Sequence, residues 1–288
     1  MRVLIGIGAT AAQLAPAKLL ERSLTENADG LEIVVSIICN EPEWEIISNN
    51  SELSIGTVFS LQRFLVSEIA RRNSCDVAIY LDSDIICLRP FSDLVQQYVK
   101  NNQLICLARP NPNFHQHIQS AVMLTGATER HVFFFRSLLS KYLNSEVSYK
   151  ELHEKLYQNE EVLLVNHKYN SRDYFDTETV FLHFTDLWTQ PWVSPYRKEG
   201  SVWLKNHYRY MSDSESYKEL VEYGVEKKYY RRGLLRSVSV FSDLFFLPPQ
   251  LNVYRRRHLF FRLVPKPVLG FLVQLIAWIR SVLNIRTT

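Results

Sequence analysis

The sequence predicts an α/β fold, because short apolar runs alternate with helical patterns along most of the chain. The 288 residues are 47% hydrophobic and 22% charged, which is the composition of an ordinary globular protein. Strand candidates followed by amphipathic stretches are typical of βαβ units around a mostly parallel central sheet flanked by helices. The four cysteines show no Cys-x-x-Cys spacing, which disfavours a zinc or redox pair and fits a reducing, cytoplasmic compartment.

The predicted elements follow one another in a regular order. The opening apolar run is too short for a signal peptide, and we interpret Val3–Gly8 as the first strand. A helix beginning near Pro16 and a strand over Leu31–Cys39 come next, and we expect a loop over Glu41–Ile55. Further predicted helices are Thr57–Asn73, Phe91–Val99, His131–Tyr142 and Tyr149–Tyr157, and further strands are Val77–Asp84, Ile85–Leu88, Gln103–Ala108, Gln119–Thr125 and Val162–Val165.

The first strand ends in a glycine motif. Gly6 and Gly8, with Ala11, match the Gly-x-Gly-x-x-Ala pattern of dinucleotide-binding folds. The acid that should confirm the motif lies about 20 residues further on, whereas Glu41 follows at about 30. The alternative is a tight turn that lets another ligand approach the backbone, or simply a strand-to-helix turn.

The strand Val77–Asp84 ends in two carboxylates, Asp82 and Asp84. Its apolar run is typical of a strand buried on both faces, and open α/β sheets hold ligands at the carboxyl ends of their strands. If the backbone stays extended, both carboxylates point to one side and could face one cation. Asp and Ser also favour turns, so the pattern alone leaves a structural role open.

A second short apolar strand, which begins at Thr179, also ends in polar groups. It delivers His183 and Asp186, and a stiff turn at Pro191 follows. A lone histidine in such a strand is more often a core residue. Beside two carboxylates at another strand end, His183 becomes a candidate third ligand for Mn²⁺ or Mg²⁺.

Over residues 3–200 the chain resembles the GT-A fold glycosyltransferases, in particular family 8. The resemblance is carried by the Asp-x-Asp at Asp82–Asp84, the Thr- and Arg-containing segment around Arg63, the strand at Gln119–Thr125, and the His183…Gln190-Pro-Trp192 element. It implies a Rossmann-like nucleotide-diphospho-sugar transferase fold and a retaining transfer from a nucleotide sugar to a hydroxyl acceptor. It also implies that Asp82, Asp84 and His183 hold Mn²⁺, or Mg²⁺, on the donor diphosphate.

Other site residues follow from the same resemblance. Gly8, Ala9 and Thr10 are expected to line the nucleotide pocket, and Arg63, Ser83, Gln190 and Trp192 are expected to contact the donor. Gln190 stands where the family commonly has lysine, so a phosphate-supporting charge is missing. Glu161 is matched only loosely to the acidic element of the family. It and Asp186 are the candidate catalytic carboxylates.

Two other functions fit parts of the pattern. Haloacid-dehalogenase-like phosphohydrolases also carry Asp-x-Asp after an apolar strand, although there it normally follows the first strand of the chain. A non-catalytic, membrane-associated binding module on the transferase fold would explain the missing lysine.

The charge is distributed unevenly, which suggests two regions: a transferase domain over residues 1–225 and a basic, aromatic helical appendage over 226–288. The second region has twelve basic residues and two acids, a net charge of +10, which leaves −7 of the total +3 for the first. Its helical apolar face favours an anionic membrane surface, peripheral on the cytoplasmic side. Packing on the core is the equal alternative, and we expect no nucleic-acid partner.

Overall fold

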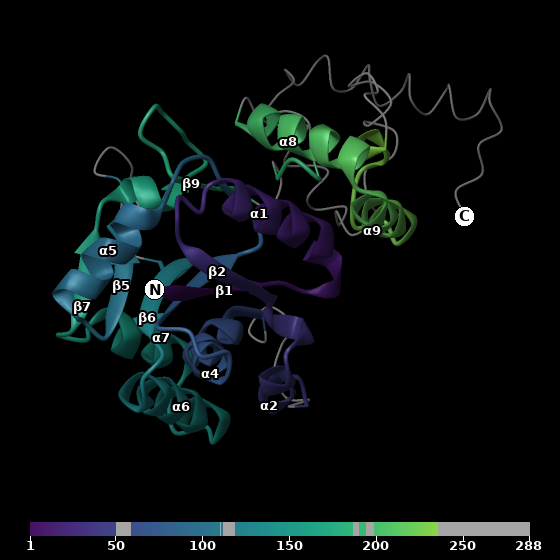
Figure 1. Cartoon of the computed structure of the whole chain (residues 1–288). Coiled ribbons are helices and arrows are strands. Elements are labelled where there is room, and N and C mark those ends of the chain that lie inside the picture. The colour runs from purple at the N-terminus through teal and green to yellow at the C-terminus, as the bar shows by residue number, and fades with distance from the viewer. Residues whose placement is uncertain (50–58, 110, 112–118, 187–189, 194–198, 236–288) are drawn as a thin grey trace, which may run out of the picture.

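The computed structural model describes residues 1–49, 59–109, 111, 119–186, 190–193 and 199–235. Its centre is a six-stranded sheet in the order β2-β1-β3-β6-β5-β7 (Figure 1). The strands are β1 (Arg2–Gly8), β2 (Glu32–Ile37), β3 (Val77–Asp82), β5 (Ile105–Ala108), β6 (Val122–Gly126) and β7 (Val162–Val165).

Strand β3 lies in the middle of this sheet, and all six of its residues are buried. It pairs in parallel with β1 and antiparallel with β6, and β6 is also antiparallel to β5. The pairs β1·β2 and β5·β7 are parallel. The prediction of a mostly parallel sheet flanked by helices is therefore confirmed, with β6 as the antiparallel exception.

Helices cover both faces of the sheet because successive strand side chains point to opposite sides. In β1, Ile5 and Ile7 face α1 (Leu14–Glu26) and α5 (Ser92–Asn101), whereas Leu4 faces the other layer. That other layer consists of α4 (Val66–Arg72), α6 (Glu129–Leu143) and α7 (Tyr149–Tyr157).

A small second sheet continues directly from the end of β3. After a turn at Ser83 and Asp84 the chain forms β4 (Ile85–Cys87), which pairs antiparallel with β9 (Phe181–His183). Strand β8 (Ser171–Arg172) lies on the other side of β9, after the 3₁₀ segment His167–Asn170. The register sets Ile85 opposite His183, so the polar end of β9 lies beside the end of β3.

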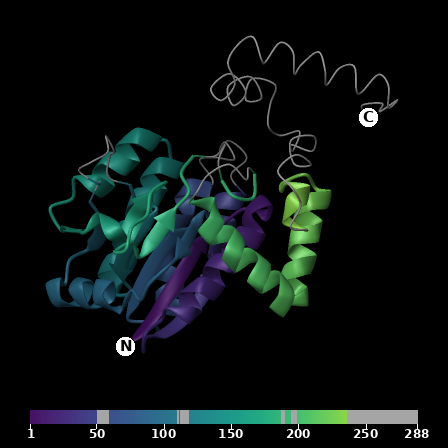
Figure 2. The same cartoon turned by 90° about the horizontal axis from the view of Figure 1, so that it is seen from above.

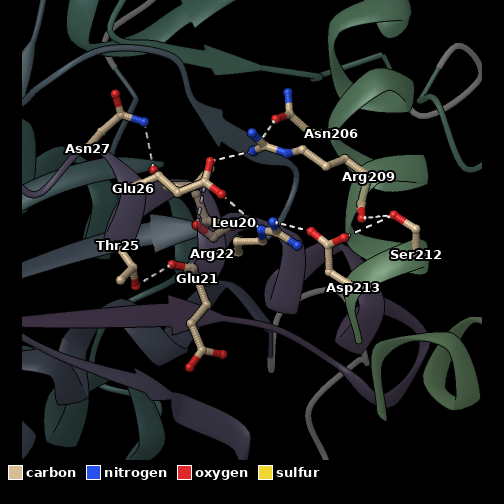
Figure 3. A network of polar contacts seen from close by, with 11 residues as sticks. Leu20, Glu21, Arg22, Thr25, Glu26, Asn27, Asn206, Arg209, Ser212 and Asp213 are labelled. Carbon is tan, nitrogen blue, oxygen red and sulfur yellow. Dashed lines mark hydrogen bonds and ion pairs between the residues drawn. The ribbon is translucent and has the colours of Figure 1, made fainter. Parts of the chain in front are cut away.

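Two helices near the end of the described chain, α8 (Gly200–Asp213) and α9 (Glu215–Glu226), lie beside α1 (Figure 2). Two ion pairs tie α1 to α8: Arg22 binds Asp213 at 2.7 Å, and Arg209 binds Glu26 (Figure 3). Within α1, Arg22 also binds Glu26 at 2.9 Å. Within the described chain, no helix has the length and apolarity that crossing a membrane requires.

A buried histidine joins α8 to the two segments that follow it. His207 is 0% exposed; its Nε2–H donates to the carbonyl of Leu234 at 3.0 Å and its Nδ1 accepts from the Tyr217 hydroxyl at 2.9 Å. Burial lowers the pKa of His207 to about 4. The ring is therefore neutral at pH 7.

Some predicted elements differ in detail. The predicted loop after β2 contains the 3₁₀ segment Pro42–Trp44 and the short helix α2 (Glu45–Ser48). In the predicted helix Thr57–Asn73, the 3₁₀ segment Gln62–Leu65 precedes α4, and residues 57–58 lie outside the described residues.

Residues up to 235 belong to the folded body, since Tyr230 and Leu234 are buried in it. Most of the predicted basic appendage, 236–288, lies outside the described residues, and the division at residue 226 stays a prediction.

Candidate functional site

Three side chains predicted to bind a cation lie together at the carboxyl edge of the main sheet. The candidate ligand atoms of Asp82, Asp84 and His183 all lie within 4.8 Å of one another. Asp82 ends β3, Asp84 occupies the turn that leads into β4, and His183 ends β9. The carboxylates converge because the backbone turns between them, and not because the strand stays extended as the sequence suggested.

Asp82 is held by two neighbours. The Tyr80 hydroxyl donates to its Oδ1 at 2.7 Å, and Nη2 of Arg63 lies 3.6 Å from the same oxygen. Burial raises the pKa of Asp82 and outweighs the opposing effect of the Arg63 charge. A buried carboxylate next to a second one is costly to ionise, and a cation between them would remove that cost.

His183 is oriented by Asn170. The amide oxygen of Asn170 lies 2.9 Å from Nδ1, so Nδ1 carries the proton and Nε2 faces Asp84 Oδ1 at 3.1 Å. The distance between Nε2 and Asp84 Oδ1 is short enough for an ion pair, but the two atoms lack hydrogen-bond geometry. Asp84 Oδ1 is therefore a buried oxygen without a hydrogen-bond partner in the described part of the chain. Burial lowers the pKa of His183, but the Asp84 and Asp82 carboxylates outweigh it and hold the pKa above its usual value.

These residues fit a divalent cation. A neutral imidazole would point a lone pair at a carboxylate oxygen, which is unfavourable unless a proton or a cation lies between them. Two carboxylates and one imidazole are a ligand set suited to Mn²⁺. A metal-bound histidine usually donates its other ring N–H to an oxygen atom, as Nδ1 of His183 does to the amide oxygen of Asn170. The buried oxygen of Asp84 without a hydrogen-bond partner supports the same interpretation.

The structure places Gln190 beside Asp84. Its amide nitrogen donates to Asp84 Oδ2 and to the carbonyl of Phe184, both at 3.1 Å, and the residue is 5% exposed. Gln190 therefore holds the candidate ligand Asp84 in place. Its side-chain nitrogen already donates hydrogen bonds to two acceptors within the chain.

Trp192 is buried between aromatic rings and not open to a ligand. Its ring centroid lies 6.4 Å from that of Phe184 and 5.3 Å from that of Trp203. The turn that carries it is held by Arg231, whose Nε–H donates to the carbonyl of Pro191 at 3.0 Å and whose backbone N–H donates to the carbonyl of Trp192 at 2.9 Å. The end of the described chain thus supports the turn beside Asp84.

The residues expected to line a nucleotide pocket are mostly buried. Gly8 and Ala9 are buried, and both the N–H and the carbonyl of Ala9 are bound by the side chain of Gln62 at 2.8 Å. Thr10 is partly exposed and begins a 3₁₀ turn. Ser83 is 0% exposed, and its N–H donates to the carbonyl of Gly8 at 3.0 Å.

Gly8 makes room for Tyr80. A Cβ atom at position 8 would lie 2.1 Å from the Tyr80 hydroxyl oxygen, so only glycine lets this hydroxyl reach Asp82. The close approach predicted at this glycine is therefore made by a side chain of the protein itself.

The group of clustered candidate ligands includes neither of the two candidate catalytic carboxylates. Glu161 precedes β7, at the amino edge of the sheet opposite Asp82, and its carboxylate pairs with Arg130. Asp186 follows β9, and its backbone N–H lies 3.5 Å from the Asp173 carboxylate. The sequence analysis assigned Glu161 to the site from a loose motif match. In the structure Glu161 lies before the first residue of β7, whereas the clustered residues lie at the edge where β3 ends.

A pocket of about 410 Å³ opens beside the clustered residues. Its lining includes the three clustered residues and Arg63, together with side chains that the sequence analysis did not single out: Gln119, Ala121, Tyr149, His153, Tyr157 and Thr185. Arg63 is 6% exposed, so its charge is buried in the lining of this pocket. Tyr149, His153 and Tyr157 are spaced four residues apart on a predicted helix, and this spacing could have predicted that they line one side of a pocket together.

The described residues have the GT-A fold of glycosyltransferases. Two solved structures of the glycosyltransferase GlyE of Streptococcus pneumoniae TIGR4 are similar to this chain. The apo form aligns with a TM-score of 0.52 at 15% identity and the other with 0.51 at 14%, and each alignment covers 80% of this chain and 64% of GlyE. The galactosyltransferase LgtC with donor and acceptor sugar analogues aligns with a TM-score of 0.44 at 14% identity, covering 77% of this chain and 95% of LgtC.

No protein-family model and no curated protein sequence matches the chain. At the identities found, the structural similarity establishes the fold. The chain spans less than two thirds of GlyE, so activity and substrates are matters for proposal.

Proposed function

We propose that the protein is a metal-dependent glycosyltransferase that moves a sugar from a nucleotide-diphosphate donor to a hydroxyl acceptor. The observation that carries the proposal is the convergence of Asp82, Asp84 and His183 at the carboxyl edge of a GT-A sheet. Such an edge is where open α/β sheets bind ligands. The fold similarity favours a transferase over the phosphohydrolase alternative.

The proposed chemistry is departure of a nucleoside diphosphate from the sugar. Asp82, Asp84 and His183 would hold Mn²⁺ or Mg²⁺, which supplies Lewis-acid neutralisation of the diphosphate. Tyr80 and Arg63 orient Asp82, Gln190 orients Asp84, and Asn170 orients His183. Arg63 lines the same pocket and adds a fixed positive charge beside the diphosphate.

We further propose transfer with retention of configuration. Inversion needs a side-chain base that removes the acceptor proton. Among the described residues that line the pocket, the only carboxylates are Asp82 and Asp84, and the proposal assigns both of them to the cation. This supports retention, and the anomer of the product observed by NMR tests it.

Replacement of Asp84 tests the function. With Mn²⁺ and a panel of nucleotide sugars, the wild type should show a donor-dependent rise in melting temperature and slow donor hydrolysis, because a ligand that binds only the folded state stabilises it. Asp84→Asn should abolish both effects. The matched control is Asp93→Asn, an exposed acid in the first turn of α5, which should behave as wild type.

The outcomes separate the three candidate functions. Undiminished turnover by Asp84→Asn would end the proposal. Hydrolysis of simple phosphomonoesters in preference to nucleotide sugars would favour the phosphohydrolase. Donor binding by the wild type without any turnover would favour the non-catalytic binding module.

A further inference from the structure

Helix α7 presents a strip of three rings to the pocket. Tyr149, His153 and Tyr157 are four residues apart, so they share one face of the helix, and all three line the pocket beside the clustered residues. The ring centroids of Tyr149 and His153 are 4.5 Å apart, and those of His153 and Tyr157 are 5.7 Å apart. We call these three residues the α7 strip.

Polar contacts connect the α7 strip to the candidate cation site. The Tyr157 hydroxyl lies 3.2 Å from Nδ1 of His153 and 3.2 Å from the hydroxyl of Ser120. The same Ser120 hydroxyl accepts from Nη1 of Arg63, and Arg63 in turn faces Asp82. One end of the strip is therefore anchored at the residues proposed to hold the diphosphate, and the exposed end is Tyr149, which is 38% exposed.

The α7 strip carries no net charge. Burial, together with the Arg63 charge, lowers the pKa of His153 to about 4, so its ring is neutral at pH 7. The neighbouring lining residues Gln119 and Ala121 are neutral as well, and Arg63 already faces Asp82. Among the described lining residues, this side of the pocket offers neither a free cation for a uronate nor a carboxylate for an amino sugar.

Aromatic rings with hydroxyl and imidazole groups suit a ligand that has both apolar C–H faces and hydroxyls. Rings contribute apolar contact area at a low entropic cost, while their polar atoms fix orientation. An uncharged hexose has this character. A charged sugar would lose solvation here without gaining a partner.

The topology shows which part of a donor would reach the strip. From β3, the sheet extends to β1 and β2 on one side and to β6, β5 and β7 on the other. Thr10 follows β1, whereas α7 leads into β7. The resemblance implies that the nucleoside of a donor lies toward β1, at Gly8, Ala9 and Thr10. With the diphosphate at Asp82 and Asp84, the sugar then reaches the α7 strip, which lines the same pocket.

We propose that the α7 strip is the surface on which the transferred sugar lies and that it selects an uncharged hexose. The inference rests on the proposed glycosyl transfer and adds to it the class of sugar and the residues that recognise it. Tyr149 is the best residue to replace, because it is partly exposed and its substitution should leave the fold intact.

The test compares each donor with its own nucleoside diphosphate. Calorimetric titrations of the full-length chain with Mn²⁺ would use UDP, UDP-glucose, UDP-galactose, UDP-glucuronate, GDP and GDP-mannose. Loss of a ring contact should weaken binding about three- to tenfold. Tyr149→Ala should therefore weaken binding of the preferred neutral donor by that factor and leave binding of its nucleoside diphosphate within about twofold of wild type. Tyr149→Phe should retain most of the affinity.

The control variant is Tyr223→Ala, which removes an exposed tyrosine from α9 and should change neither affinity. Equal weakening of the donor and of its nucleoside diphosphate would overturn the assignment, because the strip would then hold the nucleoside. Unchanged donor binding with a raised KM for the acceptor would place the acceptor there instead. Binding of UDP-glucuronate as tight as that of the neutral donors would refute the charge selection. A wild-type protein that binds none of the nucleotides would refute the proposed function itself.

Discussion

The close contact between Gly8 and Tyr80 allows a direct test of how the packing of two neighbouring strands positions Asp82. In Gly8→Ala the new Cβ would lie 2.1 Å from the Tyr80 hydroxyl oxygen and 2.8 Å from Cζ. Tyr80 is 0% exposed in the central strand, so its ring has no free space to move into. The variant must either shift β1 away from β3 or displace the hydroxyl from Asp82.

Either response costs stability. Overpacking a buried site typically costs about 1–3 kcal/mol. For a domain of this size, each kcal/mol lowers the melting temperature by roughly 2–4 °C. Displacement of the hydroxyl also removes the 2.7 Å hydrogen bond to Asp82, so Mn²⁺ affinity should fall.

A double-mutant cycle isolates the contact. Tyr80→Phe alone loses the hydrogen bond to Asp82, but it also removes the oxygen that would lie 2.1 Å from the new methyl group, the closest of its contacts; Cζ at 2.8 Å and Cε2 at 2.9 Å remain. We therefore expect Gly8→Ala/Tyr80→Phe to be at least about 1 kcal/mol more stable than the sum of the two single effects predicts. Urea unfolding of the four proteins gives the free energies.

The control is Gly200→Ala at the start of α8. There a Cβ would lie 3.4 Å from its nearest neighbour, an ordinary contact distance, so little change is expected. Effects of Gly8→Ala and Tyr80→Phe that add within about 0.5 kcal/mol would refute the reasoning. So would a Gly8→Ala protein as stable as wild type.

Three further predictions concern other parts of the chain. Because His207 stays neutral when folded but takes up a proton when unfolded, stability should fall as the pH drops from 6.5 toward 4, by roughly 3 kcal/mol. Urea unfolding at several pH values should show a smaller acid loss for His207→Gln; an identical loss would contradict this. Arg231→Lys should loosen the Pro191 turn and weaken Mn²⁺ binding severalfold by calorimetry, and unchanged affinity would exclude this support role. Replacing Arg255–Arg257 by Gln in the full chain should reduce sedimentation with anionic vesicles, whereas equal sedimentation would remove the membrane hypothesis.

Local patterns in the sequence were sufficient for most elements up to β9 and for three of the site residues, whereas α8 and α9 were not predicted. Apolar runs and helical periodicity depend on near neighbours in the chain, so β1, β7 and α7 were predicted closely. A strand that ends in a carboxylate must deliver it to a sheet edge, which is why Asp82 and His183 could be singled out before their neighbours were known.

The tertiary structure decided everything that depends on strand order and on contacts between distant segments. Glu161 belongs to the opposite edge because β7 runs in the same direction as β3, which no local pattern reveals. Gln190 contacts Asp84 across 106 positions of the chain, and Gly8 is required by a tyrosine on another strand. The α7 strip faces the pocket because the opposite side of α7, with Leu152 and Leu156, packs into the core on one face of the sheet. Local free energies thus determine which elements form, and the packing of the whole domain determines which side chains meet.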